Sequence, residues 1–347
     1  MPHKSVRRLL AARVQANGLD RPVSEAGPGG VADVVRRTGG PQAQTWRGAA
    51  YAVRARSTAT TWSDVSHAQE IDRSVVRGWF MRGTLQLVAT EQAGPLLALL
   101  GAKLIKDSRR RYGELGLAGD LPDRAAEVIE SHLLANGPTG RARLGAVLVE
   151  AGLIGEPTGQ AVYACIRHAG LLGRVCYGPG HDAGETWVAV RDWFGEPLKL
   201  EGDAADLARR YLTAYGPATP QDFATWSGLP VPAARAAVKA VATTEVVVEG
   251  ESLAAIGELP GCDDVRLLGE FDPYLLGYKD RRYALADEHR KHIHPGGGML
   301  RPAVVEGGLV IGSWQHSNAK VELFDQAAEP AGLAAEIEDL ARFVKPA

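Results

Sequence analysis

The sequence predicts an α+β protein in which small helical units each end in a β-hairpin and a separate β module closes the chain. Two observations in the 347 residues support this prediction. Helical periodicity, interrupted first by a Gly-Pro pair and then by a Gly-Leu pair, occurs twice in the middle of the chain. After Ile256 the pattern changes to short apolar strands separated by turn residues.

Two copies of one plan begin at Pro122 and at Asp203. Each copy predicts three short helices followed by two strands, an outline typical of a winged helix-turn-helix. Winged helices usually bind DNA, but they also serve as protein-interaction modules. The fold alone therefore does not define a function.

The N-terminal part is interpreted as a third, more divergent copy. Helices are expected at about 5–17, 31–38 and 62–77, before the β-rich stretch GWFMRGTLQLVA, and residues 39–59 form an insertion relative to the other copies. The full prediction is three tandem winged helix-turn-helix units and a small C-terminal β module. Its boundaries are 1–118 for the divergent winged helix, 119–200 and 201–258 for the second and third, and 259–347 for the β module with a closing helix at 331–344.

Charge is distributed unevenly along the chain. The whole sequence has 39 basic and 41 acidic residues, and a net charge of −2 spread evenly would argue against nucleic acid as a partner. Residues 1–111, however, contain 18 basic and eight acidic residues, a net of +10, whereas the remainder carries −12. Phosphate affinity depends on local charge, so a polyanion is expected at the N-terminal part. A solvated basic surface without a partner is the alternative.

Several classes of protein are excluded by patterns that the sequence lacks. It has no apolar run long enough for a membrane span and no secretory signal, so a cytoplasmic protein acting at the nucleoid is expected. Three cysteines without a CxxC pair disfavour a disulfide framework, a zinc site and an iron–sulfur cluster. No phosphate-binding loop of the GxxxxGK[ST] type occurs. We therefore expect neither a metal nor a cofactor.

The most unusual local feature is Gln42-Ala43-Gln44, which follows Gly39-Gly40-Pro41. Residues i and i+2 lie on one side of an extended segment but far apart around a helix. Both amides can therefore serve one site only if this segment is not a regular helix, and the preceding Gly-Gly-Pro favours that conformation. A loop with two solvated glutamines is the alternative.

Three further motifs follow in order: MRGTL at 81–85, FDPYLLGYKDR at 271–281 and VIGSW at 310–314. With these motifs the sequence resembles, over nearly its whole length, the AlkZ/YcaQ family of winged-helix bacterial DNA glycosylases. Its Gln-x-Gln form is similar to the AlkZ-like branch, which is linked to self-resistance against DNA-alkylating antibiotics. The resemblance implies a monomeric enzyme that acts on double-stranded DNA carrying alkylated guanine, with Gln42 and Gln44 as the catalytic residues.

The chain departs from the family pattern at two positions. Many relatives have His where this chain has Gln86, and Asp where it has Glu91. If that His contacts DNA or the lesion in relatives, the lesion specificity differs here.

Two glutamines limit the chemistry of such a site. Hydrolysis of an N-glycosidic bond normally needs an acid for the leaving base and a carboxylate for the sugar cation and the water. Glutamine cannot titrate and offers only dipoles and hydrogen bonds. These suffice when the base is already cationic, as in an N7-alkylguanine. We assign Gln44 to hold the attacking water, and Gln42 to orient it or to stabilise positive charge at the anomeric carbon.

The expected function is thus a monofunctional DNA glycosylase that excises bulky or crosslinked N7-alkylguanines. The alternative is a non-enzymatic winged-helix transcription regulator, although the helices expected to read DNA are poor in base-contacting side chains. A protein-interaction scaffold is disfavoured by the basic N-terminal part.

DNA contacts are expected from basic residues in several segments. Individually each arginine near the motif is an ordinary surface residue, and only as a group do they support binding. Residues 288–298 (EHRKHIHPGGG) could enter a groove as a hairpin, and the His-x-His within them lacks a third metal ligand. The candidate DNA-binding residues are Arg47, Arg54, Arg56, Arg82, Lys279, Arg281, Arg290, Lys291, His292 and His294.

Overall fold

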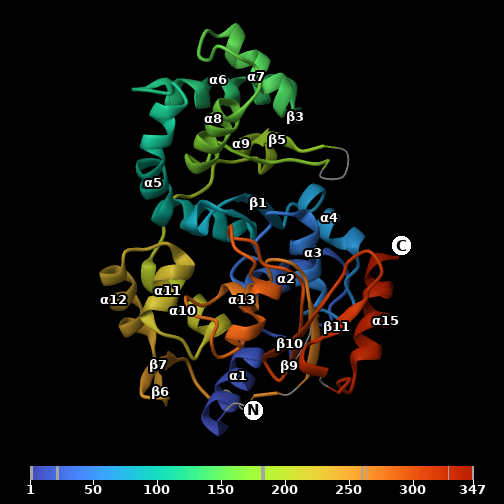
Figure 1. Ribbon diagram of the computed structural model, residues 1–347. Helices are drawn as coiled ribbons and strands as arrows, with labels where there is room; N and C mark the ends of the chain where they lie inside the picture. Colours follow the sequence, from blue (N-terminus) through green and yellow to red (C-terminus); the bar gives the residue numbers. More distant parts are fainter. Residues whose placement is uncertain are drawn as a thin grey trace. The chain divides into compact units, whose positions relative to one another are not determined.

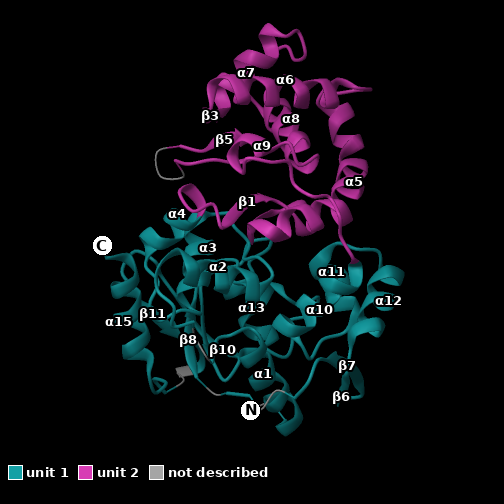
Figure 2. Ribbon diagram, turned by 180° about the vertical axis from the view of Figure 1, so that it is seen from behind, with its two compact units in different colours: residues 1–68, 204–347 teal, residues 69–203 magenta. Residues whose placement is uncertain are grey.

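The computed structural model describes residues 3–20, 23–180, 184–258, 261–262, 264–326 and 328–345 (Figure 1). It divides into two compact units, coloured separately in Figure 2. The first unit joins both ends of the chain, residues 1–68 and 204–347, and the second is the continuous segment 69–203. Helices and antiparallel sheets occur in both units, which confirms the predicted α+β class.

The N-terminal helices of the first unit agree in part with the expectation. Helices form where 5–17 and 31–38 were expected, but a further helix, α3, occupies the stretch interpreted as an insertion. The helix predicted over 62–77 is wrong at its end, because the β-branched residues after it pair with a second strand instead. These helices are α1 (Lys4–Ala16), α2 (Gly27–Thr38), α3 (Trp46–Arg54) and α4 (Trp62–Glu70).

The second unit contains the first predicted repeat and the elements that precede it. Strands β1 and β2 form a hairpin, and β3, β5 and β4 form an antiparallel sheet beside the three expected helices. Within the described residues, no helix is both long enough and apolar enough to cross a membrane. The elements are β1 (Val75–Trp79), η1 (Met81–Gly83), β2 (Leu85–Ala89), α5 (Thr90–Glu114), α6 (Leu121–Asn136), β3 (Thr139–Gly140), α7 (Arg141–Glu150), α8 (Gln160–Leu171), β4 (Val175–Tyr177), β5 (Thr186–Ala189) and α9 (Val190–Trp193).

The second predicted repeat belongs to the first unit and has the expected helices and hairpin. Its middle helix begins with a capping box, in which Thr219 and Asp222 satisfy each other's backbone N–H groups. The elements are α10 (Ala204–Tyr215), α11 (Pro220–Ser227), α12 (Val231–Val241), β6 (Thr244–Val248) and β7 (Glu251–Ala255).

The C-terminal segment forms a four-stranded antiparallel sheet in the order β11-β10-β9-β8. The expected closing helix is present as α15. The hairpin expected within 288–298 is not a strand hairpin, because a short helix and a tight turn between Gly296 and Met299 form there. The elements are β8 (Val265–Leu268), α13 (Pro273–Leu276), η2 (Asp287–His289), α14 (Arg290–Ile293), β9 (Ala303–Glu306), β10 (Leu309–Trp314), β11 (Val321–Leu323), η3 (Phe324–Gln326) and α15 (Leu333–Val344).

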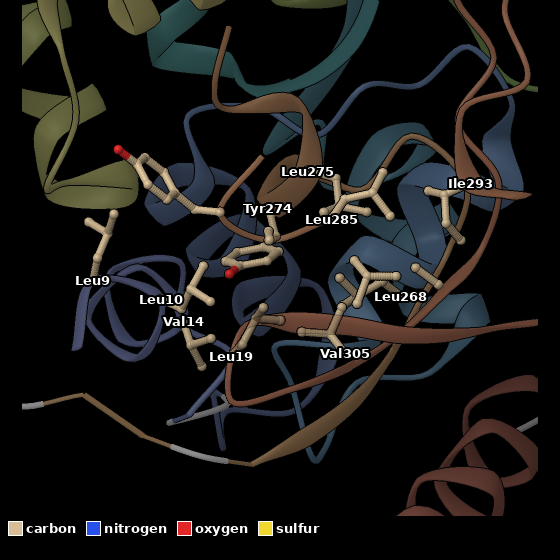
Figure 3. Packing of buried hydrophobic residues seen from close by; sticks show 14 of the residues in the cluster. Leu9, Leu10, Val14, Leu19, Leu268, Tyr274, Leu275, Leu285, Ile293 and Val305 are labelled. Carbon is tan, nitrogen blue, oxygen red and sulfur yellow. The ribbon is translucent and has the colours of Figure 1, made fainter. Parts of the chain in front are cut away.

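One hydrophobic core joins the two ends of the chain in the first unit (Figure 3). Leu10 of α1 packs in the same cluster as Leu268, Tyr274 and Val305 of the C-terminal segment. The hydroxyl of Tyr274 donates to the carbonyl of Gly308 at 2.7 Å. A side chain at Gly308 would collide with that hydroxyl, which requires glycine at this close approach. Helix α1 is therefore part of the same core as the C-terminal module.

Two arginines that we expected to bind DNA are buried instead. Arg56 is 2% exposed and forms a bidentate pair with Asp272, which is fully buried, at 2.9 and 3.0 Å. Arg54 is also 2% exposed and pairs with Glu336 and Asp339 of α15. The expectation for Arg54 and Arg56 is thus wrong, because Arg56 neutralises the buried Asp272, Arg54 neutralises the half-buried Glu336 and Asp339, and both guanidinium groups are withdrawn from the surface.

Replacement of Arg56 by Ala should lower the free energy of unfolding of the first unit by about 3–5 kcal/mol, because Asp272 would remain as an unpaired buried carboxylate. Urea unfolding measures this loss. Lys320→Ala is the control, since it opens an ion pair whose side chains are 59% and 55% exposed, and it should cost less than about 1 kcal/mol. Equal losses in the two variants would contradict the structural role of Arg56.

Candidate active site

The Gln-Ala-Gln segment is an irregular connection between α2 and α3. Gly39 ends α2 in the left-handed conformation, and residues 40–45 lie outside any helix, as expected. Ala43 is completely buried, whereas Gln42 is half-buried and Gln44 is exposed. Burial of the middle residue anchors the segment and leaves both glutamines outside the core.

The entry to this segment is held by aromatic residues of α10 and α11. The hydroxyl of Tyr215 donates to the carbonyl of Thr38, the last residue of α2, at 2.7 Å. A side chain at Gly39 would lie 3.2 Å from the ring of Trp226. The turn that leads to Gln42 is therefore fixed by a buried hydrogen bond and by close packing.

The exit is held by the cap of α3. Thr45 is the N-cap residue, and its hydroxyl accepts from the backbone N–H of Gly48 at 3.0 Å. The helix that follows is amphipathic and buries Trp46, Ala49 and Tyr51 among its residues. Gln44 thus directly precedes a helix start that is anchored in the core.

Glu270, which the sequence analysis missed, lies against this cap. It is 5% exposed and follows strand β8. Its Oε1 accepts from the hydroxyl of Thr45 at 2.8 Å and from Nε of Arg47 at 3.2 Å, and its Oε2 pairs with Nε2 of His316. Burial would raise the pKa of Glu270, but the hydrogen bond and charge of His316 and the hydrogen bond of Thr45 lower it to about 2. The carboxylate is therefore ionised and fully engaged.

Aromatic rings enclose the other side of this pair. The ring of His316 stacks on Tyr51 of α3, with centroids 4.8 Å apart, and meets Trp314 edge-on at 4.5 Å. Nε1 of Trp314 donates to the carbonyl of Leu268 at 2.7 Å. The tryptophan of the VIGSW motif therefore helps to hold the histidine that faces Glu270.

The DNA-binding candidates of the C-terminal segment partly converge. A small pocket of about 60 Å³ is lined by Lys279, Arg281, Arg290 and His294, together with acidic neighbours. Burial lowers the pKa of Arg281, and the nearby charge of Arg290 lowers it further. Two other candidates, Lys291 and His292, are exposed on the same short helix as Arg290.

The remaining two candidates lie in different units. Arg47 is 52% exposed beside the Gln-Ala-Gln segment and shares Glu270 with Thr45. Arg82 belongs to the second unit, where it adopts a left-handed conformation in the turn between β1 and β2.

The MRGTL motif determines the shape of that turn. Gly83 has a φ of +68°, and a Cβ there would lie 2.4 Å from the guanidinium of Arg167. Gln86, where many relatives have His, is 2% exposed in β2 and its amide is 3.5 Å from the carbonyl of Met81. Glu91 is exposed in the first turn of α5. Gln86 is therefore an internal residue of its unit.

Three side chains that could ligate a metal lie close together outside the His-x-His of residues 292–294. Among the described residues, ligand atoms of Glu288, His289 and Asp325 lie within 4.8 Å of one another. His289 already pairs with Asp325 at 2.8 Å, which accounts for this arrangement without an ion.

Burial raises the pKa of the Cys165 and Cys176 thiols to about 12, so neither is a nucleophile.

Comparison with known proteins identifies the class. The chain is similar to the solved structure of Streptomyces sahachiroi DNA glycosylase AlkZ, with a TM-score of 0.81 and 27% identity over 98% of this chain and 97% of that one. It is 31% identical over 340 residues to an interstrand DNA cross-link repair glycosylase from Streptomyces sahachiroi, covering 90% of this chain and 88% of the relative. The fold is thus that of a DNA glycosylase, a hydrolase of N-glycosyl bonds.

The family model for DNA glycosylase AlkZ-like proteins matches residues 35–343. The chain belongs to this AlkZ-like family. The match includes the Gln-Ala-Gln segment and the C-terminal module that holds it. Membership supports an enzyme and gives no support to the alternative of a non-enzymatic regulator.

The low pKa of Glu270 predicts a specific pH dependence of stability. The ionised carboxylate stabilises the fold above the ordinary glutamate pKa, and this contribution is lost as the pH falls toward about 2. Between about pH 5 and pH 2 the wild type should lose roughly 3 kcal/mol more unfolding free energy than Glu270→Gln. Urea unfolding across this pH range tests it.

The control for this series is Glu322→Gln, which removes an exposed carboxylate and leaves Glu270 intact. It should follow the wild-type curve. If Glu270→Gln also follows that curve, the ionised carboxylate does not stabilise the native state.

Proposed function

We propose that this protein is a monofunctional DNA glycosylase that hydrolyses the N-glycosidic bond of cationic N7-alkylguanines. Its substrates include bulky antibiotic adducts and interstrand crosslinks, so that it provides DNA repair and antibiotic self-resistance. One observation carries the proposal. The two amide side chains of Gln42 and Gln44 lie outside the core, whereas the nearby carboxylate, Glu270, is buried and paired. The similarity to a cross-link repair glycosylase supports the choice of lesion.

The geometry suits a base that leaves without protonation. The C1′–N9 bond breaks, and its electron pair neutralises the cationic guanine. Water adds to C1′ and its proton passes to solvent. The carbonyl oxygen of Gln44 accepts a hydrogen bond from this water, and the amide dipole of Gln42 orients the water or stabilises the developing sugar cation. Because neither amide can act as an acid, neutral bases such as uracil are poor substrates.

The partner in this proposal is double-stranded DNA. Its phosphates contact the C-terminal basic cluster, which consists of Lys279, Arg281, Arg290, Lys291, His292 and His294. Arg47 and Arg82 provide further contacts. In this proposal the three helix-and-hairpin segments act as winged helices, and the enzyme works as a monomer at the nucleoid in the cytoplasm, without a metal or cofactor.

The catalytic assignment is tested by base excision from DNA. The wild type should generate alkali-labile abasic sites in DNA containing N7-methylguanine or an antibiotic N7-guanine adduct. Gln42→Ala/Gln44→Ala should lower the single-turnover rate by about 100-fold or more, because both dipoles near C1′ are lost. Gel analysis after alkali treatment measures the rate.

Uracil-containing DNA is the substrate control, and no excision is expected from it. Strand cleavage without alkali would contradict a monofunctional enzyme. Full activity of the double variant would remove the two glutamines from the mechanism.

The basic cluster is tested by the salt dependence of DNA binding. Lys279→Ala/Arg290→Ala should reduce the slope of log K against log salt concentration by about 2, one for each lost phosphate contact. Fluorescence anisotropy with a lesion-free duplex measures the slope. Lys320→Ala removes an exposed lysine that is paired with Glu322 and should leave the slope unchanged. Identical slopes in all three proteins would refute the cluster as a DNA contact.

A further inference from the structure

Glu270 is an ionised carboxylate buried between the start of α3 and the end of β10. Burial of a charge is costly, and apolar residues of similar volume often stabilise such a position at least as well. Unlike an apolar group, a carboxylate at this position forms directional hydrogen bonds. Its partners therefore show which atoms it holds in place.

On one side these partners belong to the first turn of α3. The hydroxyl of Thr45 donates to Glu270 and accepts from the N–H of Gly48, so its donor and its acceptor are both engaged. A Cβ at Gly48 would lie 2.7 Å from the backbone carbonyl of Glu270. The helix start is thus in direct contact with the segment after β8. Thr45 is bonded to Gln44 through one peptide group. The position of this contact therefore determines the backbone position of Gln44.

On the other side the carboxylate is held by His316. Oε2 of Glu270 faces Nε2 of His316, whose ring is 12% exposed and stacked on Tyr51. Tyr51 belongs to α3, so His316 contacts the same helix whose N-cap residue, Thr45, is bound by Glu270. With partners on both oxygens the carboxylate cannot rotate. Thr45, Glu270, His316 and Tyr51 close a ring of contacts around the first turn and a half of α3.

We propose that Glu270 is a positioning residue for catalysis, which acts through Thr45 to aim the amide of Gln44 at the reacting sugar. This inference rests on the proposed function, because it requires that Gln44 act in the reaction. A displacement of a reacting group by about 1 Å can cost about 100-fold in rate. The effect of Glu270→Gln is expected in the chemical step, since residue 270 is buried and the glutamine oxygen can still accept the hydrogen bond of Arg47, the exposed DNA-binding candidate.

The experiment compares single-turnover excision of N7-methylguanine with the dissociation constant for the same DNA. Glu270→Gln and Thr45→Val should each lower the excision rate at saturating enzyme at least 10-fold, with the dissociation constant changed less than 2-fold. Thr45→Ser keeps the hydroxyl and should retain the wild-type rate. In the double variant the loss should not exceed that of the more severe single variant, because both changes break one chain of contacts.

Glu336→Gln is the matched control. Glu336 is another carboxylate paired with a buried arginine of α3, Arg54, but it acts at the opposite end of the helix. This variant should lower the urea midpoint yet keep the wild-type excision rate. All assays are made at a temperature at which circular dichroism shows each variant folded.

The proposal is overturned if Glu270→Gln and Thr45→Val excise at the wild-type rate, if their loss is matched by weaker DNA binding, or if Glu336→Gln loses the same activity. Failure of the proposed function gives a different result. In that case the wild type excises no base, or Gln42→Ala/Gln44→Ala excises as fast as the wild type.

Discussion

Ion pairs buried between α3 and the C-terminal module hold the first unit together. Arg54 pairs with Glu336, and Arg56 pairs with Asp272. Glu270 accepts a hydrogen bond from Thr45 at the start of the helix. A charge in a medium of low polarizability tolerates little displacement from its partner, unlike an apolar contact, which allows sliding. Both ends of one nine-residue helix are therefore fixed, and the segment before it is held by the same constraint.

This arrangement explains how the proposed active site can be built on an irregular connection. The segment between Gly39 and Thr45 lies outside the named helices and strands, and Gln42 forms only an isolated β-bridge. Its shape comes from the neighbours: Trp226 and Tyr215 at one end and Glu270 at the other. Contacts from two other stretches of the sequence, the α10 and α11 helices and the residues after β8, thus fix the backbone that carries the two amides, as the proposed catalysis by dipoles requires.

The sequence predicted the features that are determined by residues close together in the chain. The repeated helices, the hairpins and the non-helical Gln-Ala-Gln segment follow from local periodicity and turn residues, and the structure contains them. Burial of arginines depends on contacts 216 and 282 residues away, so Arg54 and Arg56 were mistaken for surface residues. One local signal existed: Arg54 lies three and four residues after Tyr51 and Ala50, on the apolar face of α3. Glu270 offered no comparable signal, because its partner Thr45 is 225 residues distant.

The first unit is discontinuous, with residues 69–203 inserted as the second unit. During synthesis the Gln-Ala-Gln segment precedes Glu270 and His316, which hold its cap, by more than 200 residues. N-terminal domains generally fold first during synthesis, but here the core of residues 1–68 lacks its partners until the C-terminal strands are made. The inserted unit can fold on the ribosome first, and the geometry of the proposed active site forms only after the C-terminal strands have been synthesised. Formation of the proposed active site is thus coupled to synthesis of the C-terminal module.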